Sequence, residues 1–168
     1  MKFSRFLFAA FALTLGIAAC KKDTDQTTLR IRLTDGPGDF QQVNIDIREI
    51  RIKTSNDTAQ WILLQTNAGI YNLLDFQNGI DTLIATGPVP SDTLKEVRFI
   101  LGPDNSVMVD SIMYPLTTPS AQESGLKVKI DKDLALDINT FVLDFDAAAS
   151  VKVQGNGVYK LHPVIKLK

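Results

Sequence analysis

Hydrophobic and polar residues alternate along most of the chain from about residue 28 onward. Leu29, Ile31 and Leu33 alternate with Arg30 and Arg32, so one face of this stretch is apolar and the other is charged. A period of two is typical of a β-strand with one buried face. Similar patterns predict strands at 60–65, 95–101, 106–110, 126–130, 134–138, 140–147, 150–154 and 158–167.

The longest alternating stretch, residues 43–52, changes phase in its middle. Apolar residues occupy every second position up to Ile47 and then resume at Ile50. A regular strand would place these two residues on opposite faces. We predict a β-bulge near Arg48–Glu49, which would turn both halves toward the core. A strand that crosses from one sheet to another would show the same pattern.

Turn residues separate these strands and set the fold class. Glycine, proline and aspartate cluster at 34–39, and Gly-Asn-Gly at 155–157 is typical of a hairpin loop. The stretch 71–86 has no clear period and could hold a helical turn. Many short strands with frequent turns favour an all-β protein, an antiparallel β-sandwich. We expect one such domain over residues 28–168.

The N-terminus carries a different pattern. Lys2 and Arg5 precede an uncharged apolar run that ends at Cys20, the chain's single cysteine. The run suits a signal peptide over residues 1–19 and is shorter than the about 20 residues that span a bilayer. Ile-Ala-Ala-Cys resembles the bacterial lipobox, in which a peptidase cuts before a cysteine that is then acylated. An ordinary signal peptide that leaves a free thiol is the alternative.

Acylation at Cys20 would decide where the protein resides. Two or more acyl chains hold a protein stably on a membrane, so we expect a lipid anchor followed by a polar tether over residues 20–27. Aspartate does not follow the cysteine, whereas lysine followed by acidic residues resembles a surface-export tag of some Gram-negative lipoproteins. The expected location is therefore the outer membrane, with exposure at the cell surface as one possibility and a plain tether as the other.

Several stretches in order resemble one known family. They are LTDGPGDFQQVNIDIREIRI, YNLLDF, the pair PS and SGLK at 119–127, LDFDAAASV and YKLHPVIK. Together they resemble the family catalogued as domain of unknown function 4382, over residues 28–168. The resemblance implies a secreted or lipid-anchored protein with an immunoglobulin-like or transthyretin-like sandwich, and it brings no assigned activity. Gly36 departs from the family, which more often has alanine there.

Charge and cysteine content exclude some classes of function. Lys2 and Arg5 lie in the predicted signal peptide, so its removal changes the formal net charge from −1 to −3. No basic patch stands out in the sequence, so nucleic acid is not an expected partner. With one cysteine there can be no internal disulfide, and stability must come from packing.

Carboxylates provide the only candidate metal ligands. Asp144 and Asp146 share one face of a predicted strand, and Asp35 and Asp39 flank a tight turn. Oxygen ligands of this kind suit calcium, although the pattern is not that of an EF-hand loop. The alternative is that these aspartates bond to backbone groups of turns, an ordinary use of this residue.

Aromatic residues and the single histidine complete the candidates. Tyr114 precedes Pro115 in a predicted loop and could contact a ligand such as a sugar ring. Trp61 is a second candidate, although its apolar neighbours favour a place in the core. His162 has no serine motif with it, and we expect a structural role.

Three hypotheses of function remain at this stage. The first is a lipid-anchored, non-catalytic envelope lipoprotein whose sandwich binds a glycan, a peptide or a partner protein. The second is a structural or assembly subunit of an outer-membrane or surface complex. The third, a hydrolase, is disfavoured, so we expect no enzyme activity and no cofactor, with calcium as an open possibility.

Overall fold

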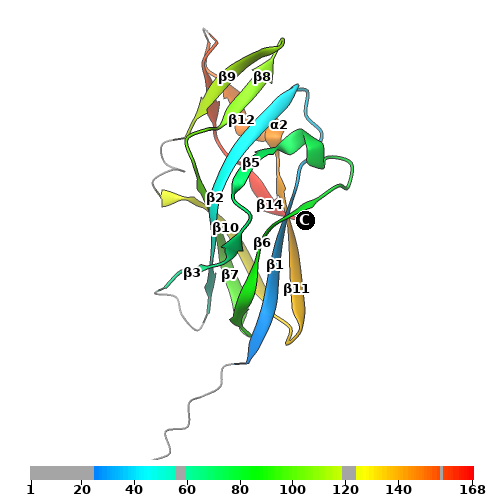
Figure 1. Ribbon diagram of the computed structural model, residues 1–168, viewed down its shortest axis with the longest axis vertical. Helices are drawn as coiled ribbons and strands as arrows, with labels where there is room; N and C mark the ends of the chain where they lie inside the picture. Colours follow the sequence, from blue (N-terminus) through cyan, green and yellow to red (C-terminus); the bar gives the residue numbers. More distant parts are fainter. Residues whose placement is uncertain (1–24, 56–59, 119–123, 156) are drawn as a thin grey trace, which may run out of the picture.

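The chain folds into two β-sheets packed against each other, which confirms the predicted all-β sandwich (Figure 1). The computed structural model describes residues 25–55, 60–118, 124–155 and 157–168. Most neighbouring strands are antiparallel, but β1 (Gln26–Thr34) pairs in parallel with β11 (Ile138–Phe145). β13 (Tyr159–Leu161) also pairs in parallel with β9 (Ile112–Thr117), so both sheets are mixed.

The smaller sheet has five strands in the order β14–β11–β1–β6–β4. Its remaining members are β4 (Gln65–Thr66), β6 (Thr82–Pro90) and β14 (Ile165–Leu167). β1 begins at Gln26, inside the stretch expected to be tether, and lies between β6 and β11. The first strand of the domain is therefore in the middle of this sheet.

The larger sheet has nine strands, with β10–β7–β2–β8–β9–β13–β12 as its main path. β3 and β5 also pair with β2. The bounds not yet given are β2 (Gln42–Thr54), β3 (Ile62–Leu63), β5 (Gly69–Asn72), β7 (Thr93–Leu101), β8 (Ser106–Val109), β10 (Leu126–Asp133) and β12 (Val151–Val153). β2 is the longest strand and carries partners along both of its edges.

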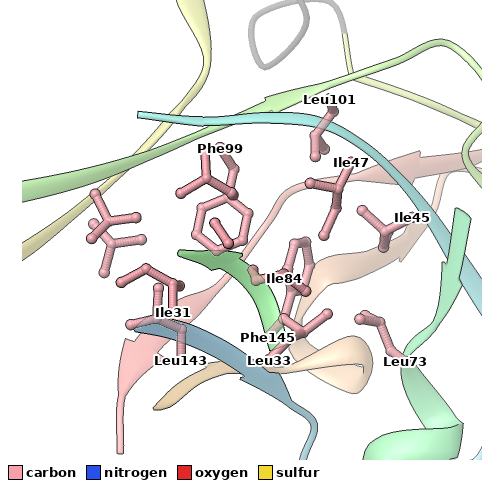
Figure 2. Packing of buried hydrophobic residues seen from close by; sticks show 14 of the residues in the cluster. Ile31, Leu33, Ile45, Ile47, Leu73, Ile84, Phe99, Leu101, Leu143 and Phe145 are labelled. Atoms are coloured by element: carbon pink, nitrogen blue, oxygen red, sulfur yellow. The ribbon is translucent and has the colours of Figure 1, made fainter. Parts of the chain in front are cut away.

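The hydrophobic core fills the space between the sheets (Figure 2). Phe99 from the larger sheet meets Phe145 from the smaller one edge to face, with ring centroids 6.5 Å apart. Both rings are fully buried, as are the alternating apolar residues of β1 and β2. Burying an aliphatic or aromatic side chain contributes about 1.5–3 kcal/mol, so this layer is the main source of stability.

The predicted bulge in β2 is confirmed. Ile47 pairs with Leu101 of β7, but the next pair joins Glu49 to Ile100, so Arg48 is the extra residue. Because of this extra residue, the side chains of both Ile47 and Ile50 point into the core, and both are fully buried. The competing interpretation, a strand that crosses between sheets, does not hold because β2 stays in the larger sheet throughout.

Three predicted strands have different boundaries. The stretch 60–65 is split between β3 and β4, which belong to different sheets. The stretch 158–167 divides into β13 and β14 because the chain changes sheets at Pro163, which has no amide hydrogen to donate. Residues 140–147 end as a strand at Phe145, and the helical turn α2 (Ala147–Ser150) follows.

Two predictions about local structure are wrong. Residues 134–137 form no strand, because the side chain of Asn139 bonds both the amide and the carbonyl of Ala135 and closes a turn. Tyr114 lies in β9 and not in a loop. The β8–β9 hairpin turns at Asp110 and Ser111, which both have positive φ. Neither is glycine, so the usual sequence signal of such a turn is missing.

Two further expectations are confirmed, whereas the strands β5 and β6 were not predicted. The unclear stretch 71–86 contains a 3₁₀ turn, η1 (Leu73–Phe76), between β5 and β6. β12 and β13 pair as antiparallel neighbours, as the glycines at 155 and 157 predict. Over the described ranges, no helix has the length and apolar character needed to cross a membrane.

Candidate functional site

The outer face of the larger sheet gathers positive charge. β2, β7 and β10 each direct basic side chains away from the core, while their intervening apolar residues are buried. We call this surface the cationic face, and we define it by Arg51, Lys53, Arg98, Lys127 and Lys129. In Figure 1 the long cyan strand β2 runs down the molecule, and β10 and β7 are labelled below its label.

Strand register places three of these cations in one row. Arg51 pairs with Arg98, and Arg98 pairs with Lys127, so the row crosses β2, β7 and β10. Neighbouring strands are about 4.8 Å apart, which brings the like charges close together. Like charges directly opposite each other destabilise a sheet. Placing these three cations in one row therefore lowers the local stability of the sheet.

Nearby groups offset only part of this repulsion. Glu49 accepts a hydrogen bond from the Nε of Arg51 at 2.7 Å. Within the described part of the chain, Arg98, Lys127 and Lys129 form no ion pair. The Nε of Arg98 is also buried without a hydrogen-bond partner. These three cations retain charge that a negatively charged ligand could neutralise.

Trp61 lies on the cationic face, against the expectation of a core position. The guanidinium carbon of Arg98 lies 3.8 Å from the centroid of the indole ring, and the Lys53 ammonium lies 5.0 Å from it. The ring therefore reaches across β2 and contacts cations from two strands. Such cation–π contacts contribute about 0.5–1 kcal/mol at exposed sites.

A second charged cluster supports the bulge of β2. Asp46 is buried, and its Oδ2 accepts hydrogen bonds from Arg48 at 2.7 Å and from the amide of Asp104 at 3.3 Å. The Asn105 side chain accepts from the Asp46 amide and donates to the carbonyl of Gly102. Gly102 leaves room for this carboxylate, because a Cβ atom there would overlap Asp46 and Arg48. This cluster is best understood as structural.

Three of the four predicted calcium ligands lie in the region where β1 and β11 end, without forming, among the described residues, a group that could hold a metal ion. Asp35 is 3% exposed, and its Oδ1 accepts from the amide of Ala147 at 2.9 Å. Asp146 caps α2 by accepting from the amide of Ala149 at 2.8 Å. Asp144 pairs with Thr34, next to Asp35, and its Oδ1 is buried without a partner.

Electrostatics at Asp35 reflect the proximity of these carboxylates. Burial raises the pKa of Asp35 above its ordinary value, and the charges of Asp144 and Asp146 raise it further. The hydrogen bonds from the Ala147 amide and the Gln77 side chain act in the opposite direction. On balance, the pKa of Asp35 lies above its ordinary value.

Asp39 lies apart from the other three carboxylates. It is exposed and lines a shallow hollow with Phe40 and the Met108–Asp110 end of the β8–β9 hairpin. Over the described ranges, no three histidine, cysteine, aspartate or glutamate side chains are grouped so as to hold a metal ion. Asp35 and Asp146 instead bond to backbone amides, which is the alternative role considered for them.

The other candidates occupy different places. Tyr114 is half-buried and packs on Tyr159, with ring centroids 4.9 Å apart, so its ring is partly covered. His162 lines a hollow of about 260 Å³ with Thr117 and Lys160, and its amide bonds the carbonyl of Ser150 at 2.7 Å. Cys20 lies outside the described residues.

The cationic face is not apparent in the sequence because its members are far apart in the chain. Arg51, Arg98 and Lys127 come from three strands and become neighbours only through strand register. A signal was present, since Arg51, Lys53, Lys127 and Lys129 all occupy outward positions of alternating strands. Counting charge on outward positions only would have revealed it.

Comparison with known proteins identifies the family. No curated protein and no solved structure matches the chain. One family profile, described as "Domain of unknown function (DUF4382)", matches residues 26–163. This range runs from the start of β1 to the point where the chain changes sheets at Pro163. The chain belongs to the DUF4382 family of domains of unknown function.

Proposed function

We propose that this chain is a lipid-anchored, non-catalytic protein of the bacterial outer membrane whose sandwich binds a ligand through the cationic face. The observation that carries the binding role is the row Arg51, Arg98 and Lys127, with Trp61 against Arg98. Unneutralised charge beside a partly exposed aromatic ring is a composition typical of binding surfaces. The ligand is a glycan, a peptide or a partner protein of the envelope.

The anchoring role is supported by the residues that precede the sandwich. The apolar run that ends at Cys20 and the polar stretch up to Asp25 suit an acylated cysteine on a short tether. Asp25 adjoins the sandwich through its carbonyl, which accepts from the Ser91 amide at 2.7 Å. Six residues extend over at most about 20 Å, so the sandwich would stay close to the membrane.

The anchor is tested by metabolic labelling with a fatty-acid analogue. The wild-type chain should take up label and sediment with membranes, whereas Cys20→Ala should do neither. Label on Cys20→Ala equal to that on the wild type would contradict the anchor. Binding is tested separately on arrays of neutral glycans, acidic glycans and envelope peptides, with Lys127→Gln/Lys129→Gln as the comparison. If Lys127→Gln/Lys129→Gln binds the same ligands as the wild type with the same strength, the cationic face is not the binding surface.

An alternative function, a structural or assembly subunit, is favoured by one observation. The β8–β9 and β12–β13 hairpins lie together at the upper end of Figure 1 and expose apolar side chains. These are Ile112 at 54%, Met113 at 46%, Val153 at 65% and Val158 at 48% exposed. β12 is also the last strand of its sheet, and an open edge can pair with another chain. Membrane-permeable crosslinking, with Val153→Asp as the comparison, would detect such a complex.

A further inference from the structure

We propose that the ligand of the cationic face is an acidic polysaccharide, bound as an extended chain across β2, β7 and β10. This inference rests on the proposed binding role of the same face. It names the chemical class of ligand, which the proposed function leaves open between glycan, peptide and protein.

The arrangement of charge indicates an extended anion. Arg51, Arg98 and Lys127 form a row perpendicular to the strands, and Lys53, Glu96 and Lys129 form the next row. Two interstrand spacings of about 4.8 Å separate the outer members of each row. A polymer with spaced negative groups can contact several of these cations together, whereas a small anion can contact only one or two.

The shape of the face also favours a polymer. Its hollow has a volume of about 280 Å³ and is lined entirely by charged residues, namely Lys53, Lys95, Glu96, Lys129 and Asp131. Small-molecule sites are usually concave and mostly apolar, so this hollow does not suit a compact ligand. A chain that lies along the surface needs no enclosure. Part of its contact would come from the edge of Trp61.

The acidic residues of the face distinguish a polysaccharide from a nucleic acid. Glu96 lies directly between Lys53 and Lys129 in the register, and Asp131 pairs with Lys95 at 3.0 Å. A carboxylate at the centre of the face repels a closely spaced phosphate backbone. The same carboxylate can accept hydrogen bonds from sugar hydroxyl groups. An acidic polysaccharide, in which charges alternate with hydroxyl groups, therefore matches the face better than a nucleic acid with its continuous line of phosphates.

The end of the sandwich nearest the tether argues against an anionic lipid surface as the ligand. Asp25 adjoins Ser91, and the neighbouring Asp92 and Asp133 bond to Ser55 and Thr93 at the same end. These carboxylates would face the membrane first and would be repelled by anionic headgroups. Because Ser55 and Thr93 lie two residues from Lys53 and Lys95, these carboxylates also border the cationic face and would oppose its contact with an anionic bilayer.

The test uses the full chain, produced with its own N-terminus and kept in neutral detergent. Polygalacturonate is the probe, with neutral dextran, double-stranded DNA and phosphatidylglycerol vesicles as comparisons. Trp61 is the only tryptophan in the chain, so its fluorescence reports on the face directly. Polygalacturonate should change this fluorescence and dextran should not, and the affinity should fall as salt is added.

Two double variants distinguish binding at the cationic face from a general electrostatic attraction between the protein and an anionic polymer. Lys127→Gln/Lys129→Gln removes two exposed cations and should weaken polygalacturonate binding about tenfold. Lys152→Gln/Lys160→Gln removes the same charge from residues that pair directly on β12 and β13, and should leave binding unchanged. Circular dichroism of both variants confirms that the sandwich is intact.

Several results would overturn the proposal. Equal weakening in the two double variants would show attraction without a site. DNA or vesicles that bind as tightly as polygalacturonate through Lys127 and Lys129 would assign the face to another class of ligand. Face-dependent binding of a neutral glycan or a peptide alone would overturn the acidic polysaccharide but keep the proposed binding role. The absence of any face-dependent ligand would remove both.

Discussion

Arg98 and Trp61 are in direct contact on the outer face of the larger sheet, with the guanidinium carbon 3.8 Å from the ring centroid. The contact joins residues from different segments of the chain and covers a cation that pairs with Arg51 on one side and Lys127 on the other. The indole thus reduces the cost of placing three like charges in a row. This relationship leads to the first prediction.

Trp61→Ala should lower the free energy of unfolding by about 1 kcal/mol, because the cation–π contacts with Arg98 and Lys53 are lost. The loss should be smaller at high salt, since salt screens the repulsion that the ring offsets. Urea unfolding followed by circular dichroism at low and high sodium chloride measures both effects. Leu63→Ala is a suitable control because Leu63 is exposed on the same face and pairs with Arg51. If the loss of unfolding free energy caused by Trp61→Ala were larger at high salt than at low salt, this explanation would be contradicted.

Gly102→Ala should destabilise the sandwich by about 1–3 kcal/mol, as overpacking of a filled site does. The new Cβ would overlap the buried carboxylate of Asp46 and the guanidinium of Arg48, so the bulge would have to shift. Gly36→Ala is the matched control, since no atom lies within 4 Å of a Cβ placed there. Thermal unfolding of the two variants gives the comparison. Similar melting temperatures would mean that the Asp46 cluster tolerates displacement.

Relative to wild type, Asp35→Asn should have a more favourable free energy of unfolding at neutral pH than in acid. The pKa of Asp35 is raised in the folded state, mainly by burial. The protonated form therefore stabilises the fold fully below the unfolded pKa of about 3.9, and this contribution is lost as the pH rises through the folded pKa. Asparagine stays neutral and can still accept the hydrogen bond from the Ala147 amide.

Urea unfolding of wild type and Asp35→Asn from pH 3 to pH 7 checks this sign. The difference in unfolding free energy should move in favour of the variant as the pH rises. Asp35→Ala is the contrasting variant, because it leaves the buried Ala147 amide without its partner at a cost of about 1–3 kcal/mol at every pH. A wild type that gains stability over the variant as the pH rises would contradict the raised pKa.

Calcium should leave the melting temperature unchanged. Asp35 and Asp146 already accept hydrogen bonds from backbone amides, and Asp39 lies elsewhere. A bound ion would stabilise the folded state by about 2.7 kcal/mol at 100 times its Kd, which would raise melting by several degrees. Melting in millimolar calcium and in chelator, for wild type and for Asp144→Asn/Asp146→Asn, decides the matter. A rise in the wild type that the double variant lacks would establish a calcium site.

The parts of the fold that follow from local periodicity could be predicted from the sequence. The change of phase between Ile47 and Ile50 was enough to locate the bulge, because burial forces both residues inward. β9 was missed because its hairpin turns at Asp110 and Ser111 without a glycine. The strand expected at 134–138 was wrong because Asn139 bonds back to Ala135, an interaction that no period reveals.

The candidate site was less predictable because it depends on which strands become neighbours. The proximity of Asp144 to Asp35 requires β1 and β11 to pair in parallel, and sequence patterns do not specify that partnership. The contact between Arg98 and Trp61 likewise depends on β7 and β3 flanking β2 on opposite sides. Pairing of strands distant in the chain is set by the whole fold and not by any single stretch.

The central place of β1 in its sheet has a consequence for the order of events during biogenesis. Thr28 pairs with Ile138, so the first strand made must wait for one synthesised 110 residues later. Closing such long loops slows folding. If the chain is exported through the membrane as its N-terminus suggests, this delay is useful, because translocation requires an unfolded polypeptide. The sandwich would then assemble only after Cys20 has already crossed, so acylation would precede folding.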